Sequence, residues 1–219
     1  MSDARLLVRS GDEGASDGAP PALQDTRAWR AAHAFCFLLG GTTFIAGTAA
    51  LFPAPTPLLA SLSAALYTLG SAGFLAVDVM EFFTLHAAPR ALRLNILLSA
   101  AGSALYVVGS IGFFPAVLGA SAAIGVWGFI LGSALIGVSQ LCKLARIAAG
   151  AQAAPWDAAS ACGVEGGAAA GAWLFLAGTV LYLRDASGGA VLQLWAAGSL
   201  AFTAGGACLA WRHFGLGLS

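Results

Sequence analysis

The sequence predicts an all-α protein of six membrane-spanning helices, arranged as three tandem helical hairpins. Of its 219 residues, 59% are hydrophobic and only 9% are charged, whereas a soluble domain carries about 25% charge. The segments Ala34–Val77 and Leu94–Cys142 contain no ionisable side chain other than cysteine and tyrosine. Each segment is long enough for two crossings, because one span needs about 20 apolar residues. A glycine-aromatic pattern that recurs along the chain is the third observation.

The chain begins with a polar segment and continues into the first hairpin. Residues 1–30 hold nine charges and too little apolar surface to fold alone, so we predict a disordered tail. The first hairpin covers residues 31–88, with spans at Ala31–Phe52 and Leu58–Phe83. The three prolines of residues 53–57 are typical of a short, stiff turn between antiparallel helices.

Two further hairpins follow the same plan. The second covers residues 89–150, with spans at Leu94–Phe114 and about 120–146, and a chain break around 115–121. The third covers residues 156–214. Its first helix is expected to begin between Asp157 and Gly166 and to end near Leu183, with Asp157 as a candidate N-cap for the early start. Its second helix is expected over Val191–Phe214.

The three hairpins show the same pattern at nearly constant offsets. Gly47 and Gly109 are 62 residues apart, and Gly70 and Gly132 are also 62 apart. The third hairpin matches when its turn is shortened by three residues. The sequence therefore predicts an internal three-fold repeat.

Glycines at these positions are expected to mark helix contacts, because helices in lipid associate through close packing at small residues. The Ser or Thr that follows many of them is expected to hydrogen-bond to a carbonyl one turn back or across a helix pair. The rival interpretation is that these hydroxyls line a polar path. The predicted packing positions are Gly40, Gly47, Gly70, Gly102, Gly109, Gly132, Gly171, Gly178 and Gly198.

Asp78, Glu81 and Gln140 form the candidate polar membrane site. Asp78 and Glu81 are three residues apart and share a helix face, and Gln140 lies 62 residues after Asp78. A carboxylate within a span is a functional candidate by default. The simpler interpretation is that both acids reach the membrane interface and pair with Arg90, Arg93 or Lys143. A polar transport path and a metal or proton site are the alternatives.

The remaining polar residues suggest no cofactor or metal site. His86 is five residues beyond Glu81 and so faces another direction, which counts against a metal pair. His33 and His213 are interpreted as solvated interfacial histidines, although either could ligate a haem or pigment. Glu165 is expected before the fifth span, facing headgroups or Arg146. Trp211, Arg212 and His213 together are typical of an interfacial anchor.

Charge placement predicts the orientation. Basic residues flank both ends of the spanning region and the connections between hairpins, whereas the three hairpin tips carry only Arg184. The positive-inside rule then places both termini in the cytoplasm, with the cell (inner) membrane as the expected location. A net charge of zero gives no basis for nucleic-acid binding.

The paired motif G-x-x-x-[FY]-x-x-G-[ST] and aromatic-x-x-G-S-x-x-[FI] resembles the YrhK-like domain, a two-helix membrane module. The resemblance covers Ala31–Phe83, Leu94–Arg146 and Gly166–Phe214, and it is weakest in the third hairpin. It implies a membrane-embedded module without catalytic residues. We therefore expect a non-enzymatic scaffold or accessory subunit without cofactor, whose partners are the lipid bilayer and either further copies or another membrane protein. The alternative is a small-solute or ion transporter or channel.

Overall fold

The computed structural model describes residues 22–53, 56–85, 88–150, 155–184 and 188–215, and this part of the chain is all-helical. Six of its α-helices are long and apolar enough to cross a membrane, which confirms the predicted all-α class with six candidate spans. A short 3-10 turn, η2, precedes them. The elements are η2 (Leu23–Asp25), α1 (Arg27–Ala49), α2 (Pro57–Thr84), α3 (Arg90–Gly112), α4 (Pro115–Ala120), α5 (Ala122–Ala148), α6 (Pro155–Leu183) and α7 (Gly188–Phe214).

Two helices begin at threonine caps. The Thr26 side chain accepts a hydrogen bond from the backbone N–H of Trp29 at 3.3 Å, and Thr56 accepts one from Leu59 at 3.2 Å. Both bonds satisfy an N–H that the first turn leaves unpaired. Because Thr26 caps α1, this helix begins four residues before Ala31, inside the segment expected to be a tail. Residues 1–21 of that predicted tail lie outside the described residues.

The connection between the second pair of spans contains a helix of its own. The sequence indicated a chain break around residues 115–121, and α4 occupies Pro115–Ala120 within it. Proline suits the first turn of a helix because its missing N–H would be unpaired there anyway. The next long helix, α5, then begins at Ala122.

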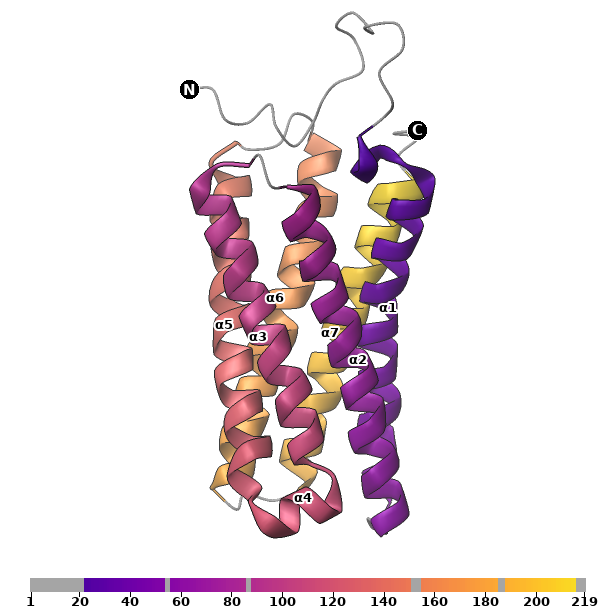
Figure 1. Cartoon of the computed structure of the whole chain (residues 1–219), viewed down its shortest axis with the longest axis vertical. Coiled ribbons are helices and arrows are strands. Elements are labelled where there is room, and N and C mark those ends of the chain that lie inside the picture. Colours follow the sequence, from indigo (N-terminus) through magenta and orange to yellow (C-terminus); the bar gives the residue numbers. More distant parts are fainter. Residues whose placement is uncertain (1–21, 54–55, 86–87, 151–154, 185–187, 216–219) are drawn as a thin grey trace, which may run out of the picture.

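The six long helices run side by side in one bundle (Figure 1), and their contacts close it into a ring. Each packs against the next along the chain, and α7 returns to pack against α1. The ends at which α1 begins and α7 ends lie at one end of the bundle, which we call the termini end. Helix α4 lies at the opposite end (Figure 1).

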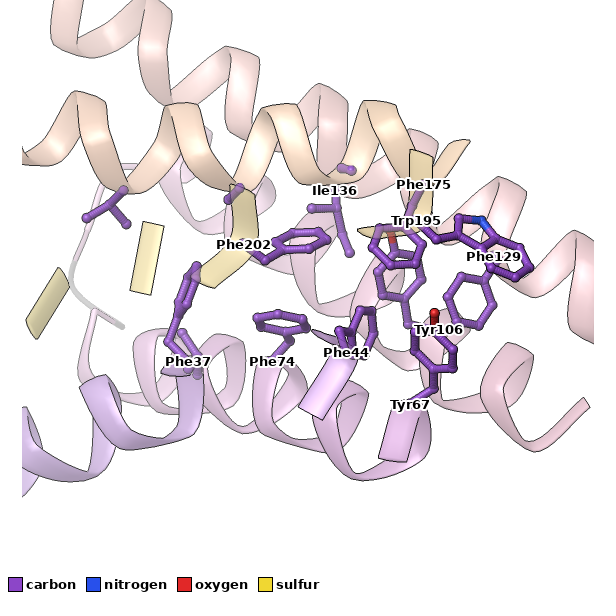
Figure 2. Close-up of a cluster of buried hydrophobic side chains, with 14 of the residues drawn as sticks. Phe37, Phe44, Tyr67, Phe74, Tyr106, Phe129, Ile136, Phe175, Trp195 and Phe202 are labelled. Carbon is purple, nitrogen blue, oxygen red and sulfur yellow. The ribbon is translucent and has the colours of Figure 1, made fainter. Parts of the chain in front are cut away.

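Aromatic side chains fill the centre of the ring (Figure 2). Phe44, Tyr106 and Phe175 are fully buried, and their rings lie among others from the remaining long helices. The ring centroids of Phe44 and Phe175 are 5.2 Å apart, and those of Tyr106 and Phe129 are 4.8 Å apart in a stacked pair. Such pairs stabilise a core by about 0.5–1.5 kcal/mol each beyond the area that they bury.

The predicted packing glycines lie where a neighbouring helix or ring leaves no room for a side chain. A Cβ built on Gly109 would lie 2.7 Å from Phe129 Cδ2, and one on Gly171 would lie 2.7 Å from Phe202 Cδ2. Eight of the nine positions show a contact under 3.0 Å, and Gly47, at 3.3 Å, is less tight. Small residues here let the large rings approach the facing backbone.

Candidate functional site

Charged side chains gather inside the ring near the termini end. We call the following five residues the charged cluster: His33 of α1, Asp78 and Glu81 of α2, Lys143 of α5 and Glu165 of α6. Asp78, Glu81 and Lys143 lie within the last two turns of their helices. The cluster therefore lies between the aromatic centre and the termini end.

Lys143 joins two carboxylates from different helices. Its Nζ lies 3.3 Å from Glu81 Oε2 and 3.6 Å from Glu165 Oε2, and all three side chains are less than a fifth exposed. The ammonium thus ties α5 to α2 on one side and to α6 on the other. Removing one partner of such a pair leaves a buried charge without compensation.

His33 is part of the same arrangement. The residue is 4% exposed, and its Nε2 lies 3.5 Å from Glu81 Oε1. Its Nδ1 lies 3.1 Å from Nε2 of His213, and its ring stacks on Trp29 at 4.5 Å. The interpretation of His33 as a lone solvated histidine is therefore wrong, because the ring closure brings α7 beside α1.

Asp78 lies deeper and is 5% exposed. It accepts a hydrogen bond of 2.6 Å from Ser103 Oγ of α3. That Asp78 reaches the membrane interface stays a prediction; in the structure it is buried, and α2 continues for six residues beyond it. Arg93, one of its expected partners, instead lies over the ring of Phe82 at 5.7 Å.

Gln140 is buried at the corresponding place on α5, but its contacts differ. Its Oε1 has no hydrogen-bond partner, and neither has Nδ2 of the buried Asn95 on α3. Ser139 Oγ donates to the Asn95 carbonyl at 3.1 Å. Asp78 and Glu81 thus have polar contacts across helices, whereas the Gln140 carbonyl is buried unpaired.

A second ion pair fastens α7 to the beginning of α6. Arg212 Nε lies 2.8 Å from Asp157 Oδ1, and Nη2 lies 3.4 Å from Oδ2. Asp157 is in the first turn of α6, so it is not the N-cap that the sequence suggested. Glu165 likewise lies inside α6 and contacts Lys143, contrary to the expected position before the helix. Both corrections have one cause: α6 begins at Pro155, two residues before the earliest predicted start, Asp157.

The sequence holds one signal that predicts part of this cluster. Glu81 lies eleven residues after Gly70, and Lys143 lies eleven residues after Gly132. Residues at the same place in successive hairpins face the same interior point if the hairpins surround one axis. His33, His213 and Glu165 carry no comparable signal.

The cluster combines carboxylates, an ammonium and imidazoles, which are groups that exchange protons and hold charges in place. Within the described ranges, no group of three or more His, Cys, Asp or Glu is arranged to hold a metal ion. No protein-family model, no curated protein and no solved structure matches this chain.

Proposed function

We propose that this chain is a multi-pass membrane protein of YrhK-like type that acts as a non-enzymatic scaffold or accessory subunit. Its three hairpins would be an internal repeat, and both termini would lie in the cytoplasm, at the cell (inner) membrane. The observation that carries the proposal is the aromatic centre. Rings from the long helices fill the space that a solute would have to cross, and Phe44, Tyr106 and Phe175 are all fully buried there.

Corresponding positions support the repeat. Phe44, Tyr106 and Phe175 each lie four residues after a glycine of the repeated pattern, namely Gly40, Gly102 and Gly171. Each of those glycines in turn faces a side chain of its own helix pair: Gly40 faces Phe74, Gly102 faces Ile136 and Gly171 faces Phe202. Three helix pairs with the same internal contacts are what tandem duplication of one hairpin would produce.

The buried hydroxyls favour a closed bundle over a polar path. Ser71, Ser110 and Thr179 each donate to the carbonyl four residues earlier, at 2.7–2.8 Å. A hydroxyl has one proton to donate, so these groups are engaged within their own helices. Ser71 Oγ of α2 and Ser110 Oγ of α3 also lie 3.1 Å apart, and a hydrogen bond between them requires one of the two hydroxyls to give up its bond to its own helix.

Transport of a small solute or ion is the second candidate. The observation that favours it is the charged cluster, because ionisable residues inside a span commonly mark ion or proton pathways. Asp78 is the deepest acid of this cluster and the one nearest the aromatic centre. It is therefore the residue whose charge a transport pathway would require.

Flux measurements on purified protein in liposomes distinguish the two candidates. We expect proton and potassium flux no greater than in protein-free vesicles, for the wild type and for Asp78→Asn alike. Asp25→Asn, which changes an exposed acid, is the matched control. A wild-type flux that Asp78→Asn abolishes and Asp25→Asn leaves intact would establish transport and end the scaffold proposal.

The orientation has its own test. In a variant without its four native cysteines, single cysteines are placed at Ser2, Ser219 and Pro53. A membrane-impermeant thiol reagent added outside intact cells is expected to label only the cysteine at position 53. After the cells are opened, all three are expected to react. Labelling of positions 2 and 53 from the same side would refute the six-span topology.

A further inference from the structure

Two buried side-chain amides lie at the contact between α3 and α5, and each has one atom without a hydrogen bond. Asn95 of α3 is 8% exposed and Gln140 of α5 is 5% exposed. Nδ2 of Asn95 is a donor and Oε1 of Gln140 is an acceptor, and neither has a partner within the described part of the chain. Because a buried polar group without a partner is costly, proteins satisfy such groups with their own atoms or with ordered water.

The packing of α3 on α5 places the two amides at the same level of the bundle. The helices are antiparallel, and a Cβ built on Gly102 would lie 2.9 Å from the carbonyl oxygen of Gly132. Asn95 lies seven residues before Gly102, and Gln140 lies eight residues after Gly132. Both are therefore about two helical turns from this contact in the same direction. Ser139, next to Gln140, donates to the Asn95 carbonyl at 3.1 Å, which fixes the same register.

The two unpaired atoms restrict the kind of ligand that can satisfy both. A cation would bind the Gln140 carbonyl oxygen but repel the N–H groups of Asn95, and an anion would do the reverse. A ligand that satisfies both atoms must accept one hydrogen bond and donate another. One donor and one acceptor at the same level thus indicate a neutral ligand, and water is the smallest molecule that makes both bonds.

We infer that a water molecule is bound between α3 and α5, where it accepts a hydrogen bond from Nδ2 of Asn95 and donates one to Oε1 of Gln140. Buried waters of this kind make about two to four hydrogen bonds to groups that would otherwise be unpaired. The water adds a second polar link between the two helices, beside the bond from Ser139 to the Asn95 carbonyl. This inference is independent of the proposed scaffold function.

The corresponding positions of the other two helix pairs do not repeat this site. His33 and Asp78 lie 62 residues before Asn95 and Gln140, but they contact other helices: His33 contacts a histidine of α7 at 3.1 Å, and Asp78 accepts from Ser103 of α3 at 2.6 Å. In the third pair these places hold Val164 and Gly206, which have no polar side chain. Of the three corresponding places, the water therefore belongs to the contact between α3 and α5.

Solid-state NMR of ¹⁵N-asparagine-labelled protein in lipid bilayers tests the inference directly, because Asn95 is the only asparagine in the chain. The label therefore gives two assigned signals, the backbone nitrogen and Nδ2. When magnetisation is transferred from water protons, we expect the Nδ2 signal to build up several-fold faster than the backbone signal, whose N–H is bonded within α3. If Nδ2 instead donated directly to Gln140, both signals would build up slowly, and that result overturns the inference.

A variant shows whether Gln140 holds the water. Gln140→Met removes the acceptor at a similar side-chain length, and the build-up at Nδ2 is expected to slow several-fold. Gln193→Met, at an exposed glutamine of α7, is the matched control and should leave the build-up unchanged. A fast build-up that survives Gln140→Met would mean that Asn95 meets water without Gln140, which overturns the inference. A wild-type Nδ2 signal as slow as the backbone signal overturns it even if the variant fails to fold.

Discussion

The middle of the ring and the termini end use corresponding positions of the three helix pairs in opposite ways. In the middle these positions hold similar residues with the same burial: Thr48, Ser110 and Thr179 are all at most 1% exposed. At the termini end they diverge, since Glu81 corresponds to Lys143 in the second pair and to Leu209 in the third. Three similar side chains form a layer, whereas an acid, a base and an apolar residue form a specific contact.

The two regions thus depend on different properties: the middle depends on packing, and the termini end depends on the charges of particular residues. The aromatic centre follows from a pattern that all three helix pairs share. This pattern requires only that small and large residues alternate. The charged cluster depends on single residues, each of which occurs in only one of the three helix pairs. It also includes His33 of α1 and Glu165 of α6. We therefore expect substitutions in the two regions to lower the stability of the protein by different amounts. We also expect that a second substitution can compensate only where charge is the cause.

The largest effect is expected at the termini end. Lys143→Met removes the ammonium that lies between Glu81 and Glu165 and leaves these two acids without it. Breaking a buried pair in this way costs about 3–5 kcal/mol, measured as the free energy of unfolding in mixed detergent micelles containing SDS. Arg90→Met, at an exposed residue, is the control and should change stability little.

A second substitution shows whether the loss comes from charge. Adding Glu81→Gln to Lys143→Met removes the charge of one of the two acids that have lost their lysine partner, so the double variant should be more stable than Lys143→Met alone. If the double variant is less stable still, the packing of the lysine chain, and not its charge, holds this end together.

A smaller loss is expected from overpacking the middle. A Cβ on Gly128 would lie only 2.6 Å from the Cα of Gly109, so the backbones of α3 and α5 nearly touch. Gly109→Leu should cost about 1–3 kcal/mol, seen as a lower unfolding temperature in detergent. Ala116→Leu, on an exposed position of α4, should be silent. Equal unfolding temperatures for the two variants would show that this glycine is not a close contact.

The smallest effect concerns one hydroxyl in the middle. Tyr106 Oη and Ser133 Oγ are 2.8 Å apart, and Tyr106→Phe removes this bond while leaving the ring. Hydrogen bonds between membrane helices contribute about 0.6 kcal/mol on average, so a loss of this order is expected in the same unfolding measurement. Tyr182→Phe, at an exposed ring, serves as control. A loss as large as that of Lys143→Met would remove the distinction between the two regions.

The sequence predicts the middle of the protein better than its end, for a physical reason. Spans follow from apolar length, and packing faces follow from glycine spacing along one helix, so both are local properties. The contact of His33 with His213 depends on α7 returning to α1, and periodicity within either helix contains no information about that. Glu165 was misplaced because the apolar run begins later than the helix, whose first turns are stabilised by contacts such as the Asp157–Arg212 pair.

The contact between α1 and α7 also bears on how the protein is made. During synthesis α1 is made before the other five long helices, and α7, the neighbour that covers its second flank, is made after them. Until then the glycine and hydroxyl faces of α1 and α6 that α7 covers, including Gly41 against Thr203, are exposed to lipid or to the insertion machinery. These six helices therefore remain an open arc until α7 inserts, and only then does the contact between α7 and α1 close the ring.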